Sequence, residues 1–295
     1  VQAVRRPRLV EWYLRLHGQH MRAQAGTYEL TQGATAQAML NQLNSGQVVL
    51  SQVTIVEGWT FAQMRAALNA NADLVHEWQH LDDVALMRAL GSAGVKAEGR
   101  FFPDTYRFAA GTSDKRIYEL SLQRMSERLR QEWEGRAPGT VVASAEAALI
   151  LASIVEKETG REDERAKVAA VFANRLRDGM RLQSDPTVIY GLGARFDGNL
   201  RRRDLETDGP YNSYMRLGLP PTPIALPGGA SIHAALHPAA SNALYFVATG
   251  VGDGSHHFSS TYAEHIVALR AFLKRTGATP DAAISGGATI HGGRK

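Results

Sequence analysis

Two glutamates near the middle of the chain have the residue type and spacing for acid–base chemistry. They are Glu156 and Glu158, in the segment Leu-Ala-Ser-Ile-Val-Glu-Lys-Glu-Thr-Gly that spans 151–160. Residues two positions apart on a helix point to nearly opposite sides. Glu158 shares its face with three apolar side chains, Leu151, Ile154 and Val155. Glu156 instead lies on a weaker and wetter face, so the two carboxyl groups are expected to differ.

The surroundings of Glu158 favour the protonated carboxyl group. A carboxylate on an apolar face loses water, which disfavours the charged form. The negative end of the helix dipole, in the last helical turn, disfavours it too. Both effects are expected to raise the pKa of Glu158, which is the direction that a general acid needs near neutral pH. The competing interpretation is an ordinary helix-end residue paired with Lys157 or Arg161.

A long segment after these glutamates has the composition of a saccharide cleft. Tyrosine faces, amides and hydroxyls suit sugars, whose apolar faces stack on aromatic rings and whose hydroxyls need fixed donors and acceptors. Asp185 precedes Pro186 and is also a common type of turn residue, so a positioning role and a loop role both stay open for it. The candidate binding residues are Gln183, Ser184, Asp185, Thr187, Tyr190, Tyr211, Asn212 and Tyr214.

The elements that must position these residues follow from hydrophobic periodicity. Apolar spacing predicts helices over about 117–133, 144–159 and 163–178, and a last helix over 262–273. Residues 181–230 are rich in Pro, Gly, Asn and Tyr and show little periodicity, which in a compact domain indicates function. Residues 244–260 are predicted to form a hairpin around a Gly-rich turn.

The first hundred residues contain a weak internal repeat with an offset of 25. Each copy has a short strand, a Gly turn, a Thr suited to capping a helix, and an amphipathic helix. The strands are predicted at 28–30 and 53–56, and chance similarity is the alternative. Helices are also predicted over 1–20 and over 72–95, while the tail beyond 276 is Gly/Ala-rich and expected to be mobile.

The bulk composition narrows the class of protein only a little. The 295 residues are 44% hydrophobic and 21% charged, which is typical of a folded globular chain. A net charge of +4 suits an acidic polymer or membrane nearby. Basic residues are scattered, which argues against a nucleic-acid-binding protein. There is no cysteine, and no stretch approaches the roughly 20 apolar residues of a membrane helix.

Four motifs, in this order, resemble the YceG-like family of endolytic murein transglycosylases. They are Ala-Ser-Ile-Val-Glu-Lys-Glu-Thr, Arg-Leu-Gln-Ser-Asp-Pro-Thr-Val-Ile-Tyr-Gly, Tyr-Asn-Ser-Tyr and Gly-Leu-Pro-Pro. The resemblance covers the chain from about Arg6 to Leu273. One departure is Thr222, where the family often has Gly after Gly-Leu-Pro-Pro. That difference affects the expected turn and gives no reason to doubt activity.

The resemblance implies an α+β fold with a small LysM-like βααβ module and a larger catalytic domain. That domain would be helix-rich, similar to lysozyme and other transglycosylases, with a β-hairpin or small sheet. The 25-residue pattern places the LysM-like subdomain at 24–80, after an N-terminal helical segment at 1–23. The catalytic domain would then cover 81–275, followed by a flexible tail at 276–295. The resemblance further implies a single-pass inner-membrane protein facing the periplasm, whose anchor would precede Val1.

The same resemblance implies a lyase reaction on peptidoglycan in which Glu158 is first the acid and then the base. Glu158 would protonate the glycosidic oxygen between N-acetylmuramic acid and N-acetylglucosamine. It would then take the proton from the 6-hydroxyl of the N-acetylmuramic acid, leaving a 1,6-anhydro end within a nascent strand. No second carboxylate is needed, unlike in two-carboxylate glycosidases. Peptidoglycan synthases are the implied protein partners.

Two other functions remain open on the sequence alone. A muramidase-type hydrolase would need a positioned water and a second carboxylate, such as Asp185. A non-catalytic scaffold would use the cleft for glycan binding only. No cofactor or metal is expected: the pairs His76/His80 and His233/His237 have metal-ligand spacing but lack a supporting signature. They are interpreted as surface histidines or satisfied core histidines.

Overall fold

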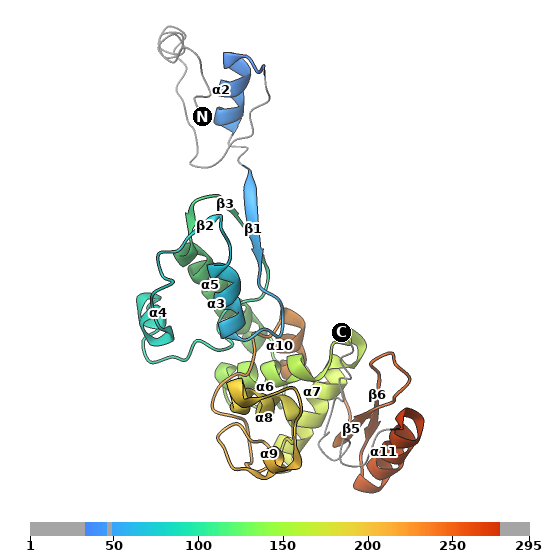
Figure 1. Ribbon diagram of the computed structural model, residues 1–295. Coiled ribbons are helices and arrows are strands. Elements are labelled where there is room, and N and C mark those ends of the chain that lie inside the picture. Colours follow the sequence, from blue (N-terminus) through green and yellow to red (C-terminus); the bar gives the residue numbers. More distant parts are fainter. Residues whose placement is uncertain (1–32, 46–48, 278–295) are drawn as a thin grey trace.

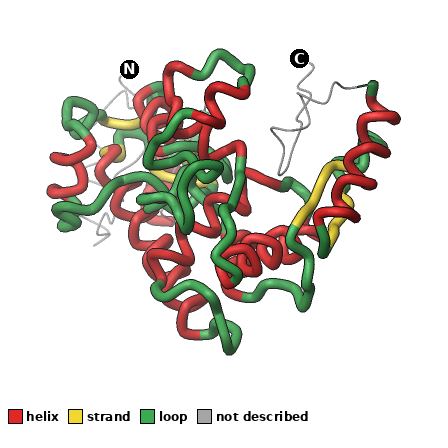
Figure 2. Tube along the Cα trace, turned by 90° about the horizontal axis from the view of Figure 1, so that it is seen from below, coloured by secondary structure: helices red, strands yellow, loops and turns green. Residues whose placement is uncertain are grey.

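The computed structural model describes residues 33–45 and 49–277 and shows a mixed α and β protein in which helices predominate (Figures 1 and 2). The α+β fold class is therefore confirmed. The predicted helix over 1–20, the strand at 28–30 and most of the tail lie outside the described residues. The helices are α2 (Ala36–Ser45), α3 (Phe61–Asn69), α4 (Asp83–Ala89), α5 (Asp114–Glu134), α6 (Ala145–Glu158), α7 (Glu162–Arg177), α8 (Asp185–Leu192), the 3-10 turn η1 (Gly193–Arg195), α9 (Arg202–Glu206), α10 (Gly229–Leu236) and α11 (Tyr262–Thr276). The strands are β1 (Leu50–Thr54), β2 (Leu74–Val75), β3 (Thr105–Ala109), β4 (Thr112–Ser113), β5 (Tyr245–Ala248) and β6 (His256–Ser259).

The repeat is confirmed in its turns and helices. Gly33 and Gly58 have φ angles of 86° and 77°, a backbone region that favours glycine. Thr35 and Thr60 each accept a hydrogen bond from the backbone N–H three residues on, so each caps the helix that follows it. These Gly and Thr residues therefore do in both copies what the pattern predicts.

The first hydrophobic core is built from the successive elements β1, α3, β2, α4 and β3, together with the start of α5. β1 and β3 pair antiparallel, with Val53 opposite Tyr106, and helices α3 and α4 come between them in the chain. Buried Phe61 stacks on Phe101 with ring centroids 4.9 Å apart. This core runs from Val53 to Tyr118 along the chain and also takes in Leu226. It thus crosses the boundary expected at residue 80, and the division into modules stays a prediction.

The helix predicted over 72–95 is wrong for most of its length. Residues 74–75 form β2, which pairs parallel with β4, and only α4 is helical. The carboxylate of Asp114 accepts hydrogen bonds from the backbone N–H groups of Glu77 and Trp78. Arg65 donates to the carbonyls of Gln79 and Leu81. These side chains from α3 and α5 bind the backbone groups that a continuous helix would have used itself.

The second hydrophobic core surrounds α6. Every residue of α6 from Ala148 to Val155 is buried, and α7 and α10 pack against it. Ser144 caps the start of α6 by accepting from the Ala147 N–H at 3.1 Å. The helices predicted over 117–133, 144–159 and 163–178 are confirmed as α5, α6 and α7. Because α6 is enclosed on all sides from Ala148 to Val155, it holds Glu158, in the turn that follows, in a fixed place at the edge of the core.

The C-terminal part matches the prediction, whereas the irregular segment contains more structure than expected. β5 and β6 form the predicted antiparallel hairpin, and α11 packs on it at one end of the molecule (Figure 2). Helices α8 and α9, with the start of α10, lie within 181–230. Each is short, because Pro and Gly residues interrupt the segment, and this is why no periodicity is visible. Among the described residues, no helix is long and apolar enough to cross a membrane.

The segment after Gly-Leu-Pro-Pro joins the two cores. The Gly58 N–H donates to the Leu226 carbonyl at 2.9 Å, and the Leu226 N–H donates to the Trp59 carbonyl at 2.7 Å. Gly99 lies directly against the ring of Pro223, with no room for a side chain. The two cores therefore meet along a closely packed seam.

This seam predicts a large stability difference between two Gly→Ala variants. Gly99 and Gly111 both have positive φ angles, 79° and 86°. A Cβ at Gly99 would overlap the Pro223 ring, whereas one at Gly111 meets nothing within 4 Å. We expect Gly99→Ala to lose about 1–3 kcal/mol more than Gly111→Ala in urea unfolding, because overpacking adds to the shared backbone strain. Equal losses of unfolding free energy would show that the residues around Gly99 shift to fit the added methyl group without an energetic cost.

Candidate active site

Glu158 lies at the end of α6 with no exposed surface, whereas Glu156 is partly exposed. The predicted difference between their two faces is confirmed. Glu156 accepts a hydrogen bond from the Gly228 N–H at 2.9 Å, so it helps to hold the joining segment. The Glu158 side chain instead points toward the start of α8, where Ser184 Oγ donates to its Oε1 at 2.5 Å. The protected carboxyl group is thus the one at position 158.

Hydroxyl groups brace the turn that carries Ser184. Ser213 Oγ accepts from the Ser184 N–H at 2.9 Å and lies 2.7 Å from Thr187 Oγ1. Thr187 in turn donates to the Ser184 carbonyl at 2.7 Å. All three side chains are buried. The Ser184 hydroxyl is therefore held in one orientation toward Glu158, and Thr187 stabilises the backbone of Ser184 through its carbonyl.

Asp185 and Tyr214 form the second polar pair beside Glu158. Tyr214 donates its hydroxyl hydrogen to Asp185 Oδ1 at 2.6 Å. Burial raises the pKa of Asp185 to about 8; the Tyr214 hydrogen bond lowers it, and the nearby charge of Glu158 adds to the rise. With a pKa of about 8, Asp185 is mostly protonated at pH 7. The site thus holds two carboxyl groups in different surroundings.

Arg175 is a residue of this site that the sequence analysis missed. It is 3% exposed and donates to the backbone carbonyls of Leu244 at 2.7 Å and Leu182 at 2.8 Å. Its guanidinium also donates to Gln183 Oε1 at 3.2 Å and lies in the field of Glu158. Burial lowers the pKa of Arg175, while the nearby acidic groups raise it. Its position in the buried stripe of α7 was the available signal, since a cation there needs a partner.

Gln183 and Asn212 are both hydrogen-bonded to backbone carbonyls of the irregular segment 181–230. Gln183 has a φ angle of 52°, unusual for a residue other than glycine, and its N–H donates to the Ser213 carbonyl at 3.1 Å. Asn212 is 4% exposed, and its amide nitrogen lies within hydrogen-bonding distance of the carbonyls of Asp204, Leu205 and Thr207. These contacts fix the backbone of the segment near Gln183 and near Asn212.

The other two candidate tyrosines, Tyr190 and Tyr211, lie apart from the Asp185–Tyr214 pair, on the side of the first hydrophobic core. Tyr190 and Tyr211 meet edge to face, with centroids 4.9 Å apart. Tyr190 donates to Glu98 Oε2 at 3.2 Å, and Tyr211 Oη lies 2.7 Å from Thr222 Oγ1. Burial raises the pKa of Glu98 to about 7, against the hydrogen bonds from Phe61 N–H and Tyr190 that lower it. The sequence analysis did not single out Glu98.

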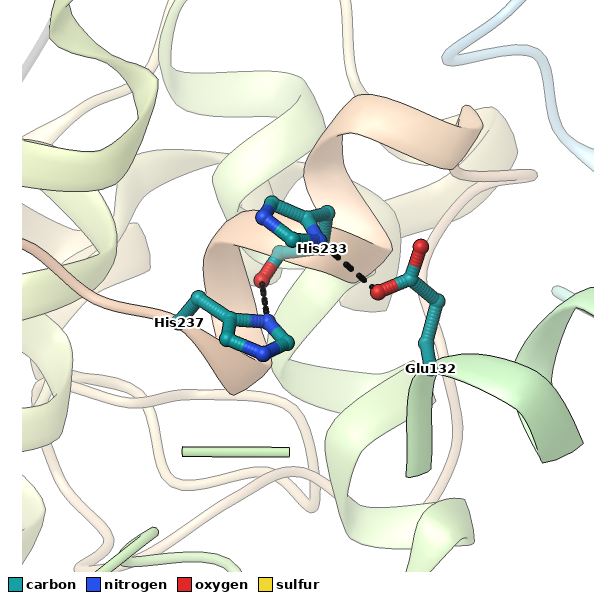
Figure 3. A group of neighbouring side chains, drawn as sticks. All are labelled: Glu132, His233 and His237. Carbon is teal, nitrogen blue, oxygen red and sulfur yellow. Dashed lines mark hydrogen bonds and ion pairs between the residues drawn. The ribbon is translucent and has the colours of Figure 1, made fainter. Parts of the chain in front are cut away.

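The histidines at the end of α10 meet Glu132 of α5 (Figure 3). His233 Nδ1 lies 2.8 Å from Glu132, and His237 lies 3.2 Å from the His233 carbonyl and 2.9 Å from that of Gly135. The two rings stack 4.1 Å apart at an interplanar angle of 15°. A metal ion binds in the plane of the imidazole ring that ligates it. These two ring planes are nearly parallel and do not intersect near the rings, so one ion cannot lie in both planes. This geometry gives no reason to place an ion there.

Comparison with known proteins decides the family. A sequence model of the YceG-like family matches residues 1–271. The chain belongs to this family. A protein of Bacillus subtilis (strain 168) named endolytic murein transglycosylase is 34% identical to it over 269 residues, which are 85% of this chain and 73% of that protein.

More distant relatives agree with this assignment. A protein of the same name from Streptococcus pneumoniae serotype 2 (strain D39) is 27% identical over 277 residues, and this chain spans only 49% of its length. The crystal structure of a YceG-like protein from Listeria monocytogenes matches with a TM-score of 0.58 and 30% identity, over 88% of this chain and 89% of that one. The motifs quoted above therefore identified the family correctly.

Proposed function

We propose that this YceG-like chain is an endolytic lytic transglycosylase of peptidoglycan, with Glu158 as its acid and base. The observation that carries the proposal is the place of this carboxyl group. It lies at the end of a buried helix, bonded to Ser184 and next to Asp185 and Arg175. The Bacillus and Streptococcus relatives carry the name of this activity.

In the proposed reaction, Glu158 protonates the glycosidic oxygen that leaves N-acetylmuramic acid. The resulting carboxylate then removes the proton from the 6-hydroxyl of that sugar, whose oxygen attacks C1 and closes a 1,6-anhydro ring. One proton leaves the carboxyl group and one returns, so no water is consumed. Because Glu158 has no exposed surface, side chains that cover it must move before a glycan can reach it.

The roles proposed for the other residues follow from their contacts. Ser184 orients the Glu158 carboxyl group, and Asp185 with Tyr214 offers polar groups to the sugar beside it. Tyr190 and Tyr211 provide aromatic faces farther along. Gln183, Thr187 and Asn212, which the sequence analysis assigned to substrate binding, are proposed to act through the shape of the loop.

Finer features of organisation also remain proposals. The LysM-like subdomain at 24–80 stays a proposal; the strand pair β1–β3 and the elements between its strands span 50–109, and we propose that range for glycan binding. We also propose a membrane anchor preceding Val1, a periplasmic location and peptidoglycan synthases as partners. Crosslinking in membranes, followed by mass spectrometry, tests the last of these.

The experiment that tests the reaction is mass spectrometry of the products from purified glycan strands. Fragments with 1,6-anhydro ends from internal cuts support the lyase. Reducing ends would mean hydrolysis by a muramidase-type reaction. Binding without shortening of the strands would mean a scaffold. Each outcome is distinct in mass, because the hydrolase adds one water and the lyase adds none.

Asp185→Asn separates the lyase from a hydrolase that uses this second carboxyl group. Since the raised pKa keeps Asp185 mostly protonated at pH 7, asparagine copies its uncharged form and still accepts from Tyr214. We expect the cleavage rate to stay within about tenfold of wild type, whereas removing a working general base costs about 10²–10⁴-fold.

The same substitution has a pH-dependent effect on stability. Folded Asp185 keeps its proton up to about pH 8, while the unfolded chain loses it near pH 4. The wild type therefore loses stability as pH rises between these values, and the variant does not. Thermal unfolding at pH 5 and pH 8.5 should show the variant gaining on wild type. A constant difference would mean that Asp185 is ionised throughout.

A further inference from the structure

A pocket of about 1190 Å³ lies between the first core and α8. One wall is the start of α3, with Phe61 and Arg65, and the facing wall carries Tyr190 and Tyr211. Glu98 is part of the lining between them. Glu158 does not line this pocket, so the pocket is separate from the reacting groups.

Glu98 is fixed in this pocket from two sides. Its Oε1 accepts from the Phe61 N–H at 2.9 Å, and its Oε2 accepts from the Tyr190 hydroxyl at 3.2 Å. Each carboxyl oxygen has a second lone pair for a ligand. A fixed acceptor beside two aromatic rings is the combination that recognises a sugar unit, because apolar sugar faces stack on rings while hydroxyl and N-acetyl N–H groups donate.

The pocket continues from the proposed reaction site along α8. Asp185 begins this helix beside Glu158, and Tyr190 lies five residues later, about 7.5 Å along the axis at the usual helical rise. An enzyme that cuts inside a strand must also hold sugars away from the cut bond. The direction of α8 and the lining of the pocket thus agree with a strand that extends past Glu158.

We infer that this pocket binds a further saccharide unit of the glycan strand, with Glu98 accepting hydrogen bonds from it. This inference rests on the proposed function, because it takes the ligand to be the same strand. Glu98 is a specificity-determining residue in this arrangement and has no part in bond breaking. Arg65 is already paired with Asp83 at 2.6 Å and bound to the Leu81 carbonyl at 2.6 Å, so the opposite wall is preorganised.

The test measures binding apart from cleavage. Peptide-free glycan oligomers are titrated by calorimetry into a Glu158→Gln protein with and without Glu98→Gln. We expect about tenfold weaker binding of long oligomers when Glu98 is replaced, since glutamine offers one acceptor oxygen in place of two, and little change for oligomers too short to reach the pocket. Glu127→Gln is the matched control, because Glu127 is exposed on α5 and paired with Arg130.

Kinetics then distinguish binding from a general structural role. With Glu158 intact, Glu98→Gln should raise KM for long strands and leave kcat unchanged. Tyr190→Phe, which keeps the ring and removes the hydroxyl bonded to Glu98, should shift KM in the same direction. Thermal unfolding confirms that each variant is folded. Unchanged affinity in a folded Glu98→Gln protein would overturn the inference.

Two further outcomes separate the inference from the proposals on which it rests. If affinity falls only for glycans that carry stem peptides, the pocket recognises peptide, and the saccharide assignment is wrong. If the wild type binds oligomers through Glu98 but never cleaves them, the reaction proposal fails while the pocket assignment stands.

Discussion

Replacing Glu158 by glutamine is expected to lower glycan cleavage by about 10²–10⁴-fold, the usual contribution of a general acid–base group. Glutamine has nearly the same shape, and its oxygen can still accept the hydrogen bond from Ser184. What it lacks is the proton that the leaving oxygen needs. Turnover should therefore fall while oligomer affinity is kept, as measured by product mass spectrometry and calorimetry.

Glu156→Gln is the matched control for this prediction. It lies two residues earlier on the same helix, and its hydrogen bond to the Gly228 N–H survives the change. Cleavage by this variant should remain close to wild type. Undiminished cleavage by Glu158→Gln, or loss of cleavage with Glu156→Gln, would move the acid–base role to the other carboxyl group.

The face of α6 was predictable because burial leaves a periodic trace in the sequence. Leu151, Ile154 and Val155 repeat at helical spacing and Glu158 continues their stripe, so its burial could be predicted, whereas the equal burial of Ala152 and Ser153 on the other face could not. The hairpin and α11 were predictable for a similar reason, since strand and helix periods differ and a Gly-rich turn separates the strands. The local sequence pattern was enough to predict a helix or strand wherever the tertiary contacts favoured the same structure.

Tertiary contacts decided what the sequence could not. Residues 77–81 have a helical pattern, yet Asp114 and Arg65 bind their backbone groups from other elements. No local signal reveals such partners. Glu98 is similar, because it gains significance only when Tyr190, 92 residues later, approaches it. The periodicity of α6 thus pointed to Glu158, whereas Arg175 and Glu98 could be recognised only once the fold was known.

Arg175→Met is expected to cost about 3–5 kcal/mol of unfolding free energy, because each buried carbonyl left without its donor costs about 1–3 kcal/mol. The variant loses donors to the Leu244 and Leu182 carbonyls and to Gln183, and it leaves Glu158 without that cation. Urea unfolding measures the loss. Arg177→Met on the same helix is the control, since Arg177 is exposed and its guanidinium donates to the Asn174 side chain.

Combining Arg175→Met with Glu158→Gln shows whether the cation supports the catalytic carboxyl group itself. If the two charges interact, the double variant loses less stability than the sum of the single losses, by about 0.5–3 kcal/mol. The reason is that glutamine no longer needs a buried cation nearby. Additive losses, within about 0.5 kcal/mol, would mean that Arg175 only holds the loop. In that case its effect on cleavage would arise through the position of Ser184 rather than through the charge of Glu158.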